Sequence, residues 1–504
     1  MSEDFDRAVA DHRAGKLESA AKIYRQLLDA DPEHADAWHL LGLTLHQRGE
    51  NDLAVETIRR ALLLNPRVAN YHNSLGLALH GAGDAAAAAQ ALQTAVTIDA
   101  GDADAHNNLG MVFTDLRRFE EAERTLRKSL SIRPDHGGAI YNLGRVLVWL
   151  GKDATALHYL RDACAHDPSN PTYWNTFGVA LDQVGDCSDA RSAFQHAIEI
   201  DSEHVDAHVN LAHNFLSDGE FEAGWREHEW RLRRPEFQRR MRLAPWCGED
   251  ISGKTILLWA EQGLGDAIHF ARFAPRVAAC GARVILEAPK ALHDLFGAIQ
   301  GVSKMVSPGY AGPHDAHAAL MSLPRIFGNA EDSEPYLTAP SAMTLDASAE
   351  CRVGLVWAGN PAHSNDRNRS YQLDQFELLG SDRIAFYSLQ VGPAASQQSP
   401  EGMRLVRLGD GFESFSDTAS AIVALDLLIT VDTSVAHLAG ALGIPVCLIL
   451  PPNPDWRWGR ESDWTPWYPS MRLFRQARGE DKRKVVERVA RALADDWRPV
   501  KVSR

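Results

Sequence analysis

The chain has 504 residues, of which 45% are hydrophobic and 24% charged, and its formal net charge at pH 7 is −15. A chain of this length exceeds the size of a single hydrophobic core, so two or three domains are expected. The acidic balance disfavours nonspecific binding to nucleic acid, and no apolar run reaches the roughly 18 residues that a membrane-spanning helix needs.

The N-terminus and the cysteines favour a cytoplasmic location. Residues 1–16 are acidic and lack the apolar core of a signal peptide. Six cysteines are scattered along the chain without a CxxC pair: Cys164, Cys187, Cys247, Cys280, Cys351 and Cys447. This spacing argues against a disulfide framework or a zinc site and for a reducing compartment.

A 34-residue period runs through residues 1–238. Glycine recurs at this interval, at Gly42, Gly76, Gly110, Gly144 and Gly178. A leucine or phenylalanine precedes each glycine, and an alanine follows it 12 positions later. This is the pattern of tetratricopeptide repeats (TPRs), in which small residues let two helices approach and stacking buries their apolar stripes. It predicts a TPR superhelix of six full repeats and part of a seventh.

One polar column of the repeats suggests a binding role. Asn108, Asn142 and Asn210 stand just before the leucine column, with Ser74 and Thr176 between them. The arm resembles that of O-GlcNAc transferases, in which an asparagine ladder holds the backbone of an extended peptide. An amide both donates and accepts, so it can satisfy a peptide bond. The alternative is that these side chains are solvated or form hydrogen bonds between repeats.

Arginines cluster where the repeats end, at Arg231, Arg233, Arg234, Arg239, Arg240 and Arg242. We expect a basic connector over residues 239–253. The cluster either faces an anionic acceptor or the donor phosphates, or it forms a solvated capping helix that pairs with nearby acids. Charge runs are usually solvated, which favours the second interpretation.

From Lys254 the pattern changes to alternating strands and helices. KTILLWAEQ (254–262) is a continuous apolar run, typical of a strand buried on both faces. A tight turn, a helix and a second strand follow, and this alternation predicts a parallel sheet with right-handed crossovers. We expect one α/β domain over 254–330, a linker over 331–351 and a second α/β domain over 352–504.

Three motifs in this half resemble heptosyltransferase-type glycosyltransferases (family 9). They are GLGD (263–266), VGLVWAGNP (353–361) and DTSVAHLAGALGIPV (432–446). The resemblance covers residues 254–495 and implies a GT-B fold, with two Rossmann-like domains and a cleft between them. O-GlcNAc transferases share the order of TPR arm and GT-B unit, but the motifs of their catalytic half are not found here.

The segment that opens a helix after the strand at 427–431 is the candidate donor site. A helix N-terminus offers free N–H groups and a partial positive charge to a diphosphate. In the resembling family the matching segment holds the sugar nucleotide, which implies this role for Asp432, Thr433, Ser434, Val435 and His437. Simple helix capping by Asp432 and Thr433 is the alternative.

The resemblance also implies catalytic roles. Asp266 would be the general base that takes the proton of the acceptor hydroxyl, and helix capping is its alternative role. Arg369, or equally Arg367, would neutralise the leaving diphosphate. Gly359 and Asn360 would shape the cleft.

The tryptophans Trp456, Trp458, Trp464 and Trp467 either stack on a ligand or pack their loop against the domain, and packing is favoured. No DxD motif sits in a suitable loop, and no cluster has the spacing of metal ligands, so no metal or other cofactor is expected.

Together these features predict a glycosyltransferase that inverts configuration without a metal. Its donor is a nucleotide sugar, and its acceptor is a hydroxyl of a protein or peptide held in the TPR groove. One alternative is a TPR scaffold with an inactive glycosyltransferase-like domain. The other is a glycosyltransferase that acts on a surface polysaccharide or lipid-linked glycan.

Overall fold

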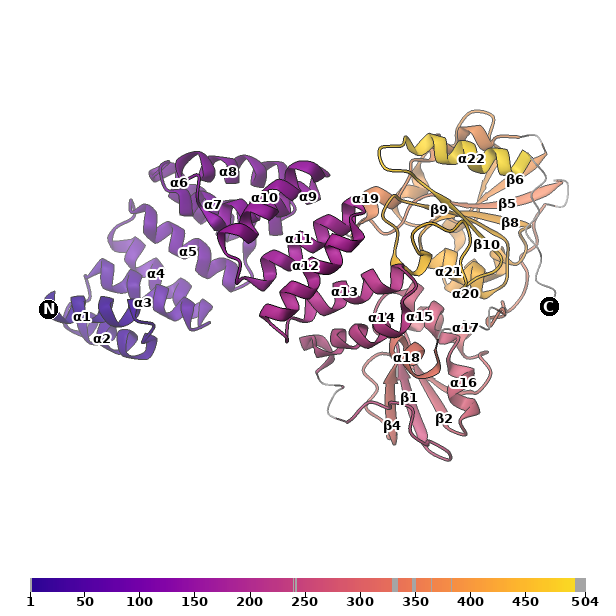
Figure 1. Cartoon of the computed structure of the whole chain (residues 1–504), viewed down its shortest axis with the longest axis horizontal. Coiled ribbons are helices and arrows are strands. Elements are labelled where there is room, and N and C mark those ends of the chain that lie inside the picture. Colours follow the sequence, from indigo (N-terminus) through magenta and orange to yellow (C-terminus); the bar gives the residue numbers. More distant parts are fainter. Residues whose placement is uncertain are drawn as a thin grey trace. The chain divides into compact units, whose positions relative to one another are not determined.

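The computed structural model describes residues 2–238, 240, 243–328, 334–346, 350–363, 365–381 and 383–494 (Figure 1). The chain forms two compact units, Met1–Ala207 and His208–Arg504. The described part of the first unit is built from helices, and the second contains two parallel β-sheets. The predicted combination of a TPR solenoid with a C-terminal parallel-sheet region is confirmed.

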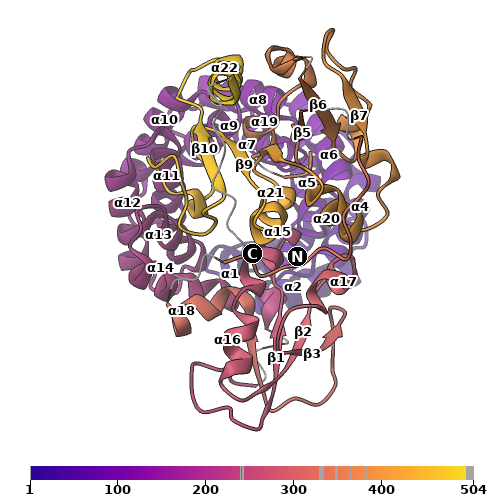
Figure 2. The same cartoon turned by 90° about the vertical axis from the view of Figure 1, so that its right-hand side faces the viewer.

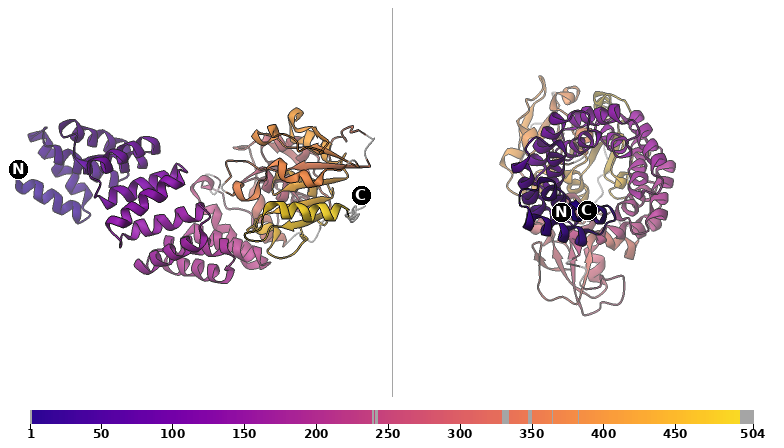
Figure 3. Two further views of the ribbon diagram at one scale, coloured as in Figure 1. Left: turned by 90° about the horizontal axis from the view of Figure 1, so that it is seen from above. Right: turned by 90° about the vertical axis from the view of Figure 1, so that its left-hand side faces the viewer.

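Helices of similar length alternate along the repeats, two per 34 residues. They are α1 (Ser2–Arg13), α2 (Leu17–Ala30), α3 (Ala35–Gln47), α4 (Asn51–Leu64), α5 (Ala69–Gly81), α6 (Ala85–Ile98), α7 (Ala103–Asp115), α8 (Phe119–Ile132), α9 (Gly137–Trp149), α10 (Asp153–His166), α11 (Pro171–Val184) and α12 (Cys187–Ile200). A seventh hairpin follows, with α13 (Val205–Ser217) and a short α14 (Phe221–His228). Seen end-on, the helices of the first unit wind around a common axis (Figure 3, right).

The recurrent glycine lies where the two helices of a repeat cross. A Cβ at any of the five glycines would come within 3.0 Å of the large apolar side chain 16 residues later. The five pairs are Gly42–Ile58, Gly76–Leu92, Gly110–Leu126, Gly144–Leu160 and Gly178–Phe194. Close helix packing therefore requires the absence of a side chain at this position.

The turn between the two helices of each repeat contains one residue with a positive φ. Glycine holds this position at Gly15, Gly49, Gly83, Gly151, Gly185 and Gly219. The fourth repeat has Arg117 instead, with φ 58°. A side chain in the left-handed region costs roughly 1–2 kcal/mol, and glycine avoids that cost.

The first sheet of the second unit, sheet A, has four parallel strands in the order β3-β2-β1-β4. They are β1 (Thr255–Trp259), β2 (Arg283–Glu287), β3 (Val302–Val306) and β4 (Ala316–Ala319). The helices α15 (Leu264–Ala271) and α16 (Ala274–Ala279) connect β1 to β2, and α17 (His293–Phe296) connects β2 to β3. A further helix, α18 (Leu323–Phe327), follows β4.

The second sheet, sheet B, has six parallel strands in the order β10-β9-β8-β5-β6-β7. They are β5 (Cys351–Val356), β6 (Ile384–Ser388), β7 (Leu405–Arg407), β8 (Leu427–Val431), β9 (Val446–Leu450) and β10 (Met471–Arg475). The helices are α19 (Asp366–Arg369), α20 (Phe415–Ile422), α21 (Ser434–Ala441) and α22 (Lys482–Ala494). α22 packs Val485, Val486 and Val489 into the core on one face of this sheet.

A single hydrophobic core links the two sheets. It contains Leu258 of β1, Leu428 of β8, and buried side chains of both α15 and α21. These two helices pack against each other, as Figure 2 shows. The residues that follow β1 and β8 are therefore brought together although they are far apart in sequence.

The two compact units divide inside α13, so the rest of the last hairpin belongs to the second unit. The repeat region was predicted to run to residue 238, whereas the compact units divide at Ala207 and His208. Trp225 of α14 is buried in the core of the second unit, with its ring 6.0 Å from Phe270 and 5.2 Å from Trp456. The burial of this large aromatic side chain gives α14 more apolar contact there than a solvated end of the array would have.

The arginine cluster at the end of the repeats is only partly solvated. Arg231 lies on a 3-10 helix, η1 (Glu229–Arg233), and is 1% exposed. Its guanidinium forms a two-pronged ion pair with Glu261, at 2.9 and 3.1 Å, which corrects the expectation of a solvated cluster for this residue. A buried arginine must be paired to offset its lost hydration. Arg239 and Arg242 lie outside the described residues.

The described part of the predicted linker contacts the helices α20 and α21. The backbone N–H groups of Tyr336 and Leu337 donate to the Ala441 carbonyl, at 3.0 and 3.1 Å, and that of Met343 donates to Ser420 at 2.8 Å. Residues 331–333 and 347–349 lie outside the described residues. None of the described helices combines the length and the apolar character that crossing a bilayer requires.

Two substitutions at the same turn position of different repeats should change the stability of the protein in opposite directions. We expect Arg117→Gly to raise the free energy of unfolding by up to about 1 kcal/mol, because it removes the left-handed strain. The matched change Gly83→Arg should lower it by about 1 kcal/mol, since no atom crowds Gly83 and only its backbone is unsuited to a side chain. Urea unfolding followed by circular dichroism measures both, and shifts of the same sign would contradict the prediction.

Candidate functional site

The candidate site lies where α15 and α21 begin, beyond the carboxyl ends of β1 and β8. A Cβ at Gly265 would lie 3.0 Å from the ring of His437 and 3.5 Å from the Cα of Ser434. Only glycine allows the first turns of the two helices to meet this closely. The two motifs that the sequence places about 170 residues apart, GLGD and DTSVAH, thus form one place in the fold.

Asp266 is held from two sides. Its Oδ2 accepts a hydrogen bond of 3.0 Å from the backbone N–H of Gly263, so it does cap α15. Its Oδ1 accepts from the guanidinium of Arg457, which is 6% exposed. Burial raises the pKa of Asp266, and the charge of Arg457 opposes that rise. The capping role is observed, and the role as a base stays a prediction.

Arg457 links this carboxylate to a second one. It donates to Asp455 at 2.7 Å, and the backbone N–H of Arg457 donates to the same oxygen at 3.0 Å. Burial by itself would raise the pKa of Asp455, but Arg457 brings it below its usual range. Neither residue was singled out from the sequence. The available signal was their place in the loop after β9, at the edge of a parallel sheet where ligands bind.

Asp432 is a half-buried carboxylate that follows β8. Burial, together with the neighbouring charge of Asp455, raises its pKa to about 6, and Arg369 acts in the opposite direction. Thr433 is the N-cap of α21, yet no described side chain caps this helix. Capping, the alternative that the sequence left open for these two residues, is therefore not made by their side chains. Ser434 and Val435 follow in the first turn, whose N–H groups favour an anion.

His437 is buried, at 6% exposure, and its Nδ1 lies 3.1 Å from the hydroxyl of Tyr468. Its ring stacks on Trp458, with centroids 5.1 Å apart. Burial lowers the pKa of His437 to about 3, so its imidazole is neutral. Tyr468 also lies 3.1 Å from Nδ1 of His269, which comes from α15. Packing thus accounts for the position of His437, and contact with a phosphate stays a prediction.

The structure distinguishes Arg369 from Arg367. A Cβ at Gly359 would come within 3.0 Å of both the Arg369 guanidinium and the Asp366 carboxylate, so the glycine makes room for that pair. Arg369 is close enough to Asp432 to lower its pKa. Arg367 is exposed, and its carbonyl accepts from Lys482 at 3.0 Å.

The loop around Gly359 is fixed by local hydrogen bonds. The Gly359 N–H donates to the Ser370 hydroxyl at 2.9 Å. The side chain of Asn360, which is exposed, accepts from the Ala362 N–H at 3.0 Å. These contacts stabilise the polar loop beyond β5 in which Arg369 lies.

The asparagine column takes part in hydrogen bonds between repeats. Each bond joins residues 35 apart in sequence: His39 to Ser74 at 2.8 Å, and Asn73 to Asn108, Asn107 to Asn142 and Tyr141 to Thr176 at 3.0 Å. The side-chain amides of Asn108 and Asn142 thus each donate one hydrogen bond to the preceding repeat. This favours the inter-repeat interpretation, which the sequence left open beside peptide binding. Asn210, on α13, is half-buried and also interacts with the protein.

Three of the four tryptophans pack their loop. Trp456, Trp458 and Trp467 are buried, whereas Trp464 is 61% exposed. Packing was the favoured interpretation, and it applies to these three. Among the described residues, no group of three histidine, cysteine, aspartate or glutamate side chains could hold a metal ion.

Comparisons with known proteins identify the repeats. Tetratricopeptide repeat models match residues 5–62, 47–105 and 103–136, so the N-terminal part of the chain consists of TPRs. Such repeats bind protein partners.

The similar proteins share a quarter or less of their aligned residues with this chain. Protein FlbA of Caulobacter vibrioides is 25% identical over 432 residues, which is 69% of this chain and 71% of FlbA. This match is longer than the first unit, so it extends into the second. The crystal structure of MamA is 25% identical and covers 32% of this chain and 94% of its own, with a TM-score of 0.30. That of Pseudomonas aeruginosa PilF is 21% identical and covers 41% and 96%, with a TM-score of 0.36.

The raised pKa of Asp432 makes a prediction about pH. A carboxylate whose pKa rises to about 6 on folding contributes stability below pH 4 and loses it as the pH passes 6. The variant Asp432→Asn has no carboxyl at this position, so its free energy of unfolding does not fall in this way as the pH rises. The free energy of unfolding of the variant minus that of the wild type should therefore increase by roughly 1–3 kcal/mol between pH 4 and pH 7. Urea unfolding at several pH values measures it.

Asp417 provides the matched control. Backbone N–H groups of Glu413 and Ser414 lower its pKa. For Asp417→Asn the same difference should hardly change between pH 4 and pH 7, because a carboxyl with a lowered pKa loses its contribution to stability only below about pH 4. A pH-independent difference for Asp432→Asn would show that the folded state does not hold this carboxyl as described.

Proposed function

We propose that the chain is a TPR protein that binds a protein partner and carries a glycosyltransferase unit. The TPR array supports the first part directly, because the family models match it. The second part depends on the site at the start of α15 and α21. There a carboxylate, a candidate phosphate site and an arginine come from different elements of two parallel sheets.

Several features of the second unit support a nucleotide-sugar donor. Two parallel sheets in tandem are compatible with a GT-B fold, and ligands of such sheets bind beyond the carboxyl ends of the strands. The first turn of α21 lacks a side-chain cap and can accept a diphosphate. Arg369, beside Asp432, is placed to meet the charge that develops on the leaving group.

Asp266 would act as the base in this proposal. Arg457 keeps it ionised in a buried place, while burial raises its pKa and so its basicity. The acceptor hydroxyl gives its proton to Asp266 as its oxygen bonds to the anomeric carbon. The bond from that carbon to the diphosphate oxygen breaks, the diphosphate leaves with the bonding electron pair, and the configuration inverts.

One observation favours a second candidate, an inactive unit in a binding scaffold. Both oxygens of Asp266 are engaged, one by Arg457 and the other by the Gly263 N–H. A base must free an oxygen to take a proton, and an ion pair to a buried arginine opposes this. In the scaffold the same contacts serve only to join the two sheets, and the repeats carry the function.

Ligand binding and turnover discriminate the two candidates. The full-length protein is mixed with ADP-, GDP-, UDP- and dTDP-sugars without added metal, and its melting temperature is measured. The release of nucleoside diphosphate by hydrolysis, in which water takes the place of the acceptor hydroxyl, is measured as well. A donor at 100 times its Kd adds about 2.7 kcal/mol to the folded state. We expect one nucleotide to raise the melting temperature. No shift and no release with any of them would favour the scaffold.

Two matched pairs of variants assign the residues. Arg369→Gln should weaken the shift, whereas Arg367→Gln should not, because only Arg369 approaches Asp432. Asp266→Asn should retain donor binding and lower turnover by about 100- to 10,000-fold. Asp417→Asn, a capping aspartate of α20, should leave turnover unchanged. Full turnover in Asp266→Asn would refute the base assignment.

A further inference from the structure

One face of sheet A is covered only in part: Trp259, near the carboxyl end of β1, packs with Leu232 of η1 and with Phe237, but no helix covers the amino-terminal half of this face. On the other face, Ile256, Leu258, Val284 and Leu286 belong to the core that includes α15 and α16. On the partly covered face, Leu257, Ile285 and Val306 form a small cluster with only Tyr310 packed against it. Tyr310 lies in the loop 307–315, which connects β3 to β4 without a helix. Parallel sheets normally have both faces covered, so this opening is unusual.

A β-bulge brings a cation onto the open face. In the pairing of β2 with β3, Val284 lies opposite Val302, but the next residue, Ile285, lies opposite Lys304. Ser303 is the extra residue, and its hydroxyl donates to the Val284 carbonyl at 2.6 Å. Without this bulge, Ile285 would lie opposite Ser303, and Lys304 would lie opposite Leu286 and point into the core. Bulges that redirect a side chain are frequent beside functional sites.

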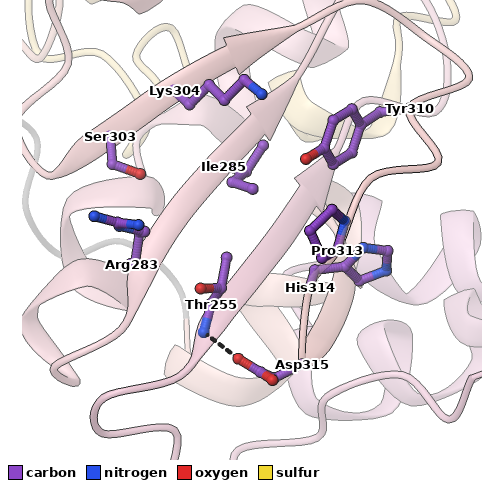
Figure 4. Close-up of a pocket in the computed structure, with 9 residues that line it drawn as sticks. All are labelled: Thr255, Arg283, Ile285, Ser303, Lys304, Tyr310, Pro313, His314 and Asp315. Atoms are coloured by element: carbon purple, nitrogen blue, oxygen red, sulfur yellow. Dashed lines mark hydrogen bonds between the residues drawn. The ribbon is translucent and has the colours of Figure 1, made fainter.

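The opening forms a pocket with basic walls. It has a volume of about 590 Å³, within the range of small-molecule sites. Arg283 and Lys304, both exposed, come from β2 and β3, and His314 comes from the loop (Figure 4). The acid that lines it, Asp315, already accepts from the Thr255 N–H at 2.7 Å. Neither Arg283 nor Lys304 has an ion-pair partner among the residues that the structure describes.

The loop 307–315, which lines the pocket, is held in place by a buried carboxylate. Glu287 is buried and accepts from the N–H groups of Gly309 and Tyr310, each at 3.2 Å, and from the Arg240 guanidinium. The Tyr310 ring in turn lies 5.1 Å from the ammonium of Lys304. The ring wall at Tyr310 and the apolar floor at Ile285 are therefore in place before any ligand arrives, which lowers the entropic cost of binding, whereas the exposed side chains of Arg283 and Lys304 turn toward the ligand as it binds.

We propose that this pocket binds a small phosphate monoester that carries a ring. The dianionic phosphate pairs with Arg283 and Lys304, because a guanidinium and an ammonium match two charges better than a single carboxylate would. The ring packs on Ile285 beside Tyr310 and Pro313. The pocket lies at the amino-terminal half of the strands, whereas Asp266 follows the carboxyl end of β1, so it is a second site independent of the proposed transferase site.

Isothermal titration calorimetry of the full-length protein tests the proposal. The probes are phenyl phosphate, glucose 6-phosphate and AMP, with phenol and inorganic phosphate as the ring and the anion alone. We expect at least one monoester to bind more tightly than both partial probes. Arg283→Ala and Lys304→Ala should each weaken that binding at least about tenfold, since a charge-assisted hydrogen bond is lost. Both side chains are exposed, so the melting temperature should hardly change.

Lys290→Ala is the matched control, because Lys290 is an exposed lysine of the same unit outside the pocket. It should bind the monoester as the wild type does. Equal affinity in all three variants would overturn the site. Binding of inorganic phosphate as tight as that of every monoester would overturn the ligand class, and binding of none of the probes would overturn both. A change in donor binding at the α21 end is not expected in any of these variants, which separates this proposal from the transferase.

Discussion

The organisation of the second unit depends on one buried guanidinium. Arg457, from the loop after β9, pairs with Asp266 of α15, the helix that follows β1, and with Asp455 of its own loop. Removing one partner of a buried ion pair typically costs about 3–5 kcal/mol, because the remaining charge is left without compensation. The pair therefore ties the strand ends of the two sheets together at the point where α15 and α21 meet. The site is built around this link: burial raises the pKa values of Asp266 and Asp432, Arg457 opposes both rises, and it brings the pKa of Asp455 below its usual range.

The repeats solve a different physical problem, that of helices too short to bury their apolar sides alone. The second to sixth hairpins are each stabilised by a glycine that admits a large side chain from its partner helix. The contacts between these hairpins include hydrogen bonds across 35 residues. Polar groups at these contacts are costly if unpaired, so pairing them fixes the spacing of neighbouring repeats. The same requirement explains why the amides of Asn108 and Asn142 form hydrogen bonds within the protein.

The two proposed sites use opposite ends of parallel strands. The helix ends at the carboxyl edge attract an anion through backbone N–H groups and the helix dipole. The pocket on the open face of sheet A instead relies on the side chains of Arg283 and Lys304, and a bulge at Ser303 places the lysine there. A site made of backbone N–H groups tolerates many side chains. The pocket on sheet A instead depends on the strand register that the bulge at Ser303 sets.

The sequence by itself determined the repeats, the parallel-sheet region and the separate motifs. Periods of 34 residues and alternating strands and helices are local signals, and they survive without knowledge of the fold. Only the tertiary structure decided that Asp266 pairs with Arg457, that His437 is neutral beside Tyr468, and that α14 belongs to the second unit. It also decided that Lys304 faces a pocket. These outcomes depend on contacts between residues distant in sequence and on a single shift of strand register, and local patterns carry neither.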